Sequence, residues 1–211
     1  MKQLFAQIPS VCGNRLLLRP LQDRDAEGLR ALTLESRVYR YLPTFLFEKQ
    51  YADPHATIAK LYDECLRDSL ILGVFKEDRF CGLAEMYGYR QPIRKISVGY
   101  RLREAYWGQG IATEALGLMV DYLLHHAGIE IITASTMIEN QASANVLKKM
   151  ASILSCMRCR RTGAMSSRSS LTNGSNSACA ASCPARHHSG LTAVTCQRSS
   201  PLWGGVMRRR P

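Results

Sequence analysis

The chain has 211 residues, long enough for a domain with a hydrophobic core, and a formal net charge of +11. All 17 acidic residues precede residue 151, whereas residues 151–211 carry nine Arg and no acid. The positive charge therefore belongs to the C-terminal segment, and the nearly neutral remainder argues against nucleic acid as a partner.

Membrane and secretory signals are not evident in the sequence. No apolar run approaches the roughly 20 residues of a membrane span, and the N-terminus lacks the sustained apolar stretch of a signal peptide. Before residue 151 the only cysteines are Cys12, Cys65 and Cys81, which is typical of reduced thiols. We therefore expect a cytoplasmic protein that does not bind a membrane.

The predicted elements begin with a strand and a capped helix. Apolar residues over 15–21 favour a strand. The carboxylate of Asp23 or Asp25 can then accept from the unpaired N–H groups of a helix that runs to about Ser36.

An aromatic loop at 39–47 separates this helix from a second one at about 53–68. The second helix opens on Asp53, with a proline in its first turn. Two apolar runs, 70–75 and 80–89, flank a charged four-residue turn and predict a hairpin.

The next predicted elements follow the same logic. Clean alternation over 96–102 favours a strand, and two apolar rows favour a helix at 110–126 that Gly128 stops. A strand at 129–136 and a short helix at 140–150 follow. The order β-α-α-β-β-β-α-β-α predicts a mixed α/β sandwich.

The junction between strand 96–102 and helix 110–126 is the most informative segment. Gly108 and Gly110 let the backbone approach a ligand closely. First-turn N–H groups have no internal partners, and the helix dipole is positive there, so the junction suits phosphate. The spacing alone leaves open an ordinary glycine-rich turn, and it matches neither the dinucleotide fingerprint nor the P-loop.

Residues 106–115, Tyr-Trp-Gly-Gln-Gly-Ile-Ala-Thr-Glu-Ala, resemble the pyrophosphate-binding loop and helix of GNAT acetyltransferases. They are most similar to the RimJ/RimL-type branch, which includes ribosomal-protein N-terminal acetyltransferases. The strand at 15–21 and the segments 140–143 and 148–150 resemble two further motifs of that branch, in the same order.

The resemblance covers about residues 14–150 and implies a GNAT fold, a mixed and mostly antiparallel sheet flanked by helices. It implies acetyl-CoA as co-substrate, no metal, and direct acetyl transfer to a primary amine, either a protein N-terminal α-amine or a small molecule. A degenerate acyl-CoA-binding protein without activity is the main alternative, and an RNA-associated protein is a weaker one. Whether the chain forms a homodimer stays open.

The resemblance also implies roles for individual residues. The N–H near Val98 would polarise the thioester carbonyl, and the backbone at Tyr100 and Leu102 would pair with the pantetheine arm. Asn140 would contact the cofactor, and Ser143 would help to protonate the departing thiolate. The pyrophosphate would be held beside Thr113 by the backbone N–H groups of Gly108, Gln109, Gly110, Ile111 and Ala112.

An acceptor amine must lose a proton before it attacks, so a carboxylate is expected nearby. Glu85 is the first candidate, with Glu104 and Glu139 behind it, although carboxylates of this kind are more often solvated surface charges. The aromatic side chains that could line the acceptor pocket, or simply pack in the core, are Tyr39, Tyr41 and Phe45.

The sequence departs from the family at three points. Trp107 occupies the first position of the loop pattern, which is common in the RimJ/RimL-type branch. Leu147 stands where many GNAT enzymes place an acidic tyrosine, and Ala151-Ser152 stands where Gly-Phe is expected.

The segment 151–211 differs in character from the rest of the chain. It contains 12 Ser and 5 Cys but no Lys, Phe or Tyr, and it has no hydrophobic period. We expect irregular or disordered structure there, with no strand pair after about residue 152, where the family has its last two strands. Its Cys and His spacings give only weak support to a zinc site.

Loss of one nucleotide just after the codon of Met150 would explain this change of character. In the restored frame Ala-Ser can encode the missing Gly-Phe, and residues 162–169 can encode Trp-Gly-Tyr-Glu-Gln-Pro-Val. An ordinary disordered Arg/Ser-rich extension is the alternative.

Overall fold

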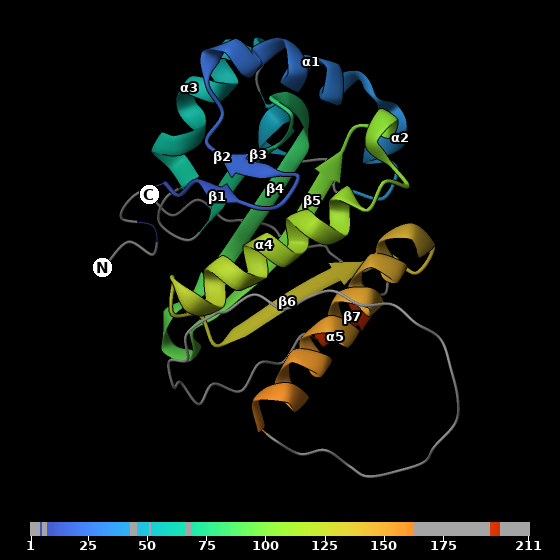
Figure 1. Cartoon of the computed structure of the whole chain (residues 1–211). Helices are drawn as coiled ribbons and strands as arrows, with labels where there is room; N and C mark the ends of the chain where they lie inside the picture. The colour runs from blue at the N-terminus through green and yellow to red at the C-terminus, as the bar shows by residue number, and fades with distance from the viewer. Residues whose placement is uncertain are drawn as a thin grey trace.

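The computed structural model describes residue 5 and residues 8–42, 46–50, 52–65, 69–162 and 195–198. Within these residues one sheet runs in the order β1-β2-β3-β4-β5-β6-β7, with helices on both faces (Figure 1). The strands are β1 Val11–Cys12, β2 Leu17–Arg19, β3 Leu70–Lys76, β4 Arg79–Arg90, β5 Lys95–Leu102, β6 Ile131–Thr136 and β7 Thr195–Arg198. The helices are α1 Ala26–Leu34, α2 Ser36–Tyr39, α3 Pro54–Cys65, α4 Ile111–His125 and α5 Gln141–Thr162.

The sheet is mixed and mostly antiparallel. Each strand from β1 to β4 pairs antiparallel with the next, whereas β6 runs parallel to β5, and β7 runs parallel to β6. The long helix α4 connects β5 to β6, as a parallel crossover requires, and lies across the sheet (Figure 1). The predicted fold class is therefore confirmed.

Each face of the sheet packs its own hydrophobic core. One core joins the sheet to α4 and α5, and its fully buried members include Leu72, Ile96 and Met119. The other joins the opposite face to α1 and α3, around Leu29 and Leu61. The fold is thus a three-layer sandwich with the sheet in the middle.

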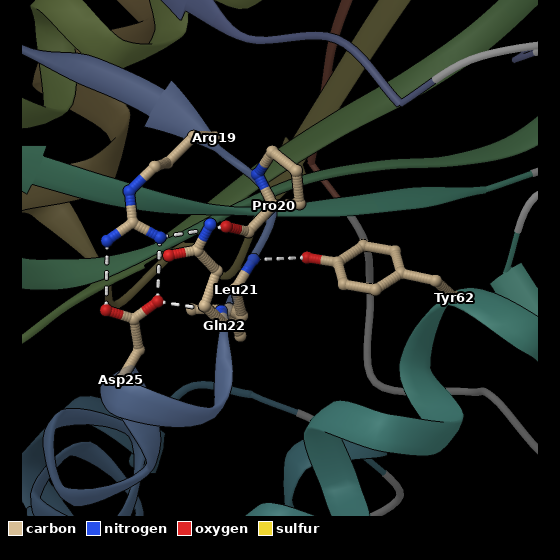
Figure 2. Close-up of polar contacts among 6 residues, drawn as sticks. All are labelled: Arg19, Pro20, Leu21, Gln22, Asp25 and Tyr62. Atoms are coloured by element: carbon tan, nitrogen blue, oxygen red, sulfur yellow. Dashed lines mark hydrogen bonds and ion pairs between the residues drawn. The ribbon is translucent and has the colours of Figure 1, made fainter.

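An ion pair fixes the end of β2 against the start of α1 (Figure 2). The guanidinium of Arg19 donates to both carboxylate oxygens of Asp25, at 2.7 and 3.0 Å, and both side chains are buried. The guanidinium also stacks on the ring of Phe75, 3.6 Å from its centroid. The backbone N–H of Leu21 donates to the hydroxyl of Tyr62 at 2.6 Å, which ties α3 to the same corner.

Of two predicted helix caps, the one by Asp25 at α1 does not form, whereas the one by Asp53 at α3 does. Asp25 does not cap α1 with its side chain; instead its Oδ2 accepts the N–H of Gln22, because Arg19 holds the carboxylate on that side. Asp53 does cap α3, since its Oδ1 accepts the N–H of His55 at 3.0 Å.

The C-terminal segment departs from expectation in two places. Helix α5 runs to Thr162, beyond the expected end at residue 150, because no glycine or proline occurs between Gln141 and Thr162 to stop it. Residues 195–198 form β7 against β6, where irregular structure was expected. The remaining residues of this segment, including the His pair and two of the five cysteines, and Phe45 of the aromatic loop lie outside the described residues.

Candidate active site

The site begins where β5 and β6 separate. The two strands pair only from Lys95 to Ser97 and from Ile131 to Thr133, although both continue further. Beyond that point the edge of β5 is not paired with β6. None of the described strands pairs with this side of the second half of β5, and we call this stretch of unpaired strand edge the opening.

The alternation of the strand decides which backbone groups face this opening. The carbonyl of Arg94 accepts N–H groups from the β6 side, whereas the N–H of Arg103 donates to Cys81 on β4. Because backbone groups of a strand alternate with a period of two, the even-numbered residues of β5 direct their N–H and C=O toward β6. Those past the last pairing are the three predicted from the sequence, Val98, Tyr100 and Leu102.

The glycine-rich loop lies at the end of this edge. Gly108 and Gly110 both have left-handed backbone, with φ of 73° and 76°, and Gly110 is the N-cap of α4. A Cβ on Gly108 would meet no atom within 4 Å, so the space beside the loop is open. The first-turn N–H groups of α4, from Ile111 to Thr113, face this end of the helix, where the dipole favours an anion.

An arginine that the sequence analysis did not single out lies beside the loop. Arg15, just before β2, binds the first turn of α4 through Glu114, with Nε to Oε2 and the backbone N–H to Oε1 at 2.8 and 3.0 Å. Its Nη2 would lie 3.6 Å from a Cβ on Gly110, and its Nη1 donates to the carbonyl of Gln109 at 3.4 Å. The loop thus has a guanidinium beside its N–H groups.

The segment between β5 and the loop is held by side-chain bonds. The carboxylate of Glu35, between α1 and α2, accepts from Arg103 Nε at 2.8 Å and from the N–H of Glu104 at 2.6 Å. The indole N–H of Trp107 donates to the carbonyl of Leu102 at 2.8 Å. These bonds fix the approach to the loop, and the last one occupies the carbonyl of Leu102.

Ser143 and Tyr100 meet on the face of the sheet that carries α4. The hydroxyl of Tyr100 donates to Ser143 Oγ at 3.4 Å, and burial raises the pKa of that phenol, against which the bond to Ser143 acts. Asn140 caps α5, because its Oδ1 accepts the N–H of Ser143 at 3.1 Å. Asn140 therefore orients Ser143, whatever else it contacts.

Glu85 lies on the opposite face of the sheet, directly across from Gly99 in the β4–β5 pairing. Its Oε2 accepts a hydrogen bond from Arg101 Nη1 at 2.8 Å, and its side chain is 23% exposed. Arg101 also pairs with the buried Glu48, at 2.7 Å between Nε and Oε1. The two predicted catalytic groups, Glu85 and Ser143, thus lie on the two faces of the sheet, with the open edge of β5 between them.

The other candidates are placed less favourably. The carboxylate of Glu104 pairs with Arg37 at 2.6 Å, and Glu139 is exposed in the loop before α5. Leu147 is buried in the core, so it takes no part in proton transfer. Tyr39 lies near Arg101 and Glu48, and burial together with the charge of Glu48 raises its pKa. The ring of Tyr41 instead stacks under the guanidinium of Arg40.

Neither a helix suited to a membrane nor a cluster of metal ligands occurs among the described residues. None of the helices there is long and apolar enough to cross a membrane. In the same part of the chain, no three His, Cys, Asp or Glu side chains gather as metal ligands.

Comparison with known proteins gives consistent matches. The sequence model described as "Acetyltransferase (GNAT) domain" matches residues 15–151. Two Bacillus subtilis (strain 168) proteins are similar in sequence. The uncharacterized N-acetyltransferase YoaA is 29% identical over 65% of this chain and 78% of its own length, and the probable N-acetyltransferase YjcK is 30% identical over 65% and 80%. The solved structure of Mycobacterium smegmatis RimJ in complex with CoA-disulfide has a TM-score of 0.59 at 22% identity, covering 70% of this chain and 76% of that one.

Proposed function

Because this chain belongs to the GNAT acetyltransferase domain family, we propose that it transfers an acetyl group from acetyl-CoA to a primary amine by direct attack. The main support for the proposal is that an unpaired strand edge and a glycine-rich helix N-terminus lie next to each other. The unpaired edge of β5 ends at a left-handed glycine loop that opens α4.

These features suit the two chemically distinct parts of coenzyme A. The N–H and C=O groups of Tyr100 would pair with the amides of the pantetheine arm, as an added strand does. The loop N–H groups from Gly108 to Ala112, with Thr113 alongside, would receive the pyrophosphate, which the helix dipole and Arg15 attract. The N–H near Val98 would polarise the thioester carbonyl.

One proton-transferring group lies on each face of the sheet: Glu85 is the proposed acceptor and Ser143 the proposed donor. The ammonium gives a proton to Glu85, and the free lone pair attacks the thioester carbon from that face. The carbon–sulfur bond then breaks, its electrons stay on sulfur, and Ser143 protonates the thiolate from the other face. The nitrogen then loses its second proton, which returns through solvent to the Ser143 oxygen, so that the hydroxyl is restored and the protons balance.

For the acceptor we propose a protein N-terminal α-amine, with a small-molecule amine as the other candidate. In support, the chain has the same fold as a solved structure described as RimL, a ribosomal L7/L12 α-N-protein acetyltransferase. The competing function is an acyl-CoA-binding protein that does not turn over. It is favoured by Leu147, which fills the place of the missing tyrosine, and by the altered segment after residue 150.

We also propose that the acetyltransferase domain spans residues 14–150 and that the segment 151–211 is translated in a shifted frame. In support, the family match stops at residue 151, and the 61 residues that follow residue 150 hold nine Arg and no acid.

The test uses the full chain in two steps. Calorimetry with acetyl-CoA should give saturable binding, and thiol release should then be measured with a short peptide bearing a free N-terminal alanine and with a simple alkylamine. Binding with turnover supports the enzyme, whereas binding without turnover on either amine favours the inactive protein. Absence of binding contradicts both.

A further inference from the structure

Arg101, Glu48 and Glu85 form a group that we call the Arg101 cluster. Arg101 and Glu48 are almost fully buried, with side chains 3% and 2% exposed, and come from β5 and from the short turn Phe47–Lys49. Two carboxylates share one guanidinium, so the cluster carries a net charge of −1. Uncompensated charge in such surroundings is costly, which makes the cluster a place where a cation binds favourably.

The free negative charge is accessible at one atom. Arg101 holds Glu85 by Oε2, and among the described residues Glu85 Oε1 has no hydrogen-bond partner. Glu48 is buried and cannot meet a ligand directly. The exposed part of Glu85 is therefore where an ammonium group would complete the cluster.

Gly99 keeps the space next to this carboxylate open. A Cβ there would lie 3.8 Å from Glu85 Oε2 and 3.6 Å from Tyr87 Cε1. The missing side chain therefore leaves space between the side chains of Glu85 and Tyr87. Gly99 follows Val98, whose backbone faces the open edge of β5. A group above Gly99 is thus one residue away from the proposed thioester position.

We infer that Arg101 is a positioning residue that fixes the Glu85 carboxylate above Gly99, with buried Glu48 as its second anchor, so that Glu85 receives the proton of the acceptor ammonium. This inference rests on the proposed acetyl transfer and adds to it the residue that orients the base. A planar guanidinium suits the role, because its N–H donors bind two carboxylates in fixed directions.

The charge state of the cluster agrees with this role. Burial by itself would lower the pKa of Arg101, but Glu85 and Glu48 outweigh it, and the pKa is raised. The other titratable groups near the cluster are Tyr39 from α2 and Tyr87 from β4, with Lys49 Nζ 3.6 Å from the centroid of the Tyr39 ring and Glu35 also acting on that phenol. Burial is the main cause that raises the pKa of each tyrosine, so both phenols are neutral near pH 7.

The main test removes the guanidinium of Arg101 and, in the same variant, neutralises its buried partner Glu48, so that no buried charge is left unpaired. The double variant Arg101→Met with Glu48→Gln is compared with Glu85→Gln and with the triple variant, using the alanine peptide and the alkylamine as acceptors. We expect the double variant to keep its affinity for acetyl-CoA, to lose roughly tenfold to a hundredfold in kcat, and to show a displaced acidic limb. Because Arg101 acts through Glu85, adding Glu85→Gln should cost little more.

A matched control is Glu27→Gln, which neutralises an exposed carboxylate on α1 that pairs with Arg30. It should leave kcat and the pH profile unchanged. If the double variant keeps the wild-type kcat and acidic limb, or if the losses simply add, the positioning role is overturned while acetyl transfer stands. If the wild-type chain acetylates neither amine, the proposed function falls, and the positioning role falls with it.

Gly99→Ala provides a second test that does not disturb the buried charges. Its Cβ would make only ordinary contacts, so the chain should fold. We expect the KM for the acceptor to rise severalfold at unchanged acetyl-CoA affinity. An unchanged acceptor KM would exclude the space above Gly99 as the amine's position and overturn the inference.

Discussion

At the residue scale, Gly110 satisfies two demands that no other residue meets. Its φ of 76° is rarely adopted by L-residues, and its missing side chain leaves the helix end open beside Arg15. We predict that Gly110→Val abolishes measurable acetyl-CoA binding in calorimetry, because the side chain fills the phosphate position and strains the turn.

A matched control separates these two effects. Gly88 has a similar φ of 67° in β4, and a Cβ there would meet no atom within 4 Å. Gly88→Ala should cost about 1 kcal/mol of stability and leave acetyl-CoA affinity unchanged. Wild-type affinity in Gly110→Val would show that the loop does not hold the cofactor.

The Tyr100 hydroxyl supports a second prediction at this scale. It donates to Ser143 Oγ and thereby leaves the serine proton free for the thiolate, and its raised pKa keeps it protonated near neutral pH. Tyr100→Phe removes one hydrogen bond worth about 1 kcal/mol, so kcat should fall roughly threefold to tenfold. Steady-state kinetics with Ser143→Ala alongside checks this, and a Tyr100→Phe loss of equal size in the Ser143→Ala background would contradict the pairing.

At the scale of elements, the buried pair of Arg19 and Asp25 joins β2 to α1 (Figure 2). Arg19→Met leaves the Asp25 carboxylate buried without its partner, and we expect a loss of about 3–5 kcal/mol in the free energy of unfolding. Adding Asp25→Asn should recover part of this loss, because the amide oxygen can still accept the N–H of Gln22. Urea denaturation of the three proteins measures both values, and an unaffected Arg19→Met chain would show that the pair is not stabilising.

The elements themselves follow from local rules to a large extent. Alternation predicts β5, the paired apolar rows predict α4, and Asp53 predicts the start of α3, because each signal lies within the element or next to it. The predicted end of α5 at residue 150 was wrong by twelve residues, since no helix-breaking residue occurs before Thr162 to stop the helix.

At the scale of the whole molecule, the proposed change of frame after residue 150 leads to a prediction about how completely the domain is built. If a nucleotide was lost there, restoring it should return the acidic, aromatic ending of the family and raise soluble yield and turnover together. Parallel expression of both versions, with limited proteolysis and an acetyl-transfer assay, tests this. Equal protease resistance and equal turnover would show that the present segment is functional as it stands.

The sequence by itself determined the glycine loop, the alternation of β5 and the order of the elements from β2 to α5, because each depends on residues close together in the chain. Only the tertiary structure decided the partners of the charged side chains. Arg101, which alternation places opposite the apolar residues of β5, is buried because Glu48 from a turn 53 residues away covers it. Arg15 reaches Glu114 across 99 residues, and Glu85 and Ser143 are assigned to opposite faces by strand order and register. Periodicity carries no information on such long-range pairings, since they depend on which strands and helices become neighbours when the sheet forms.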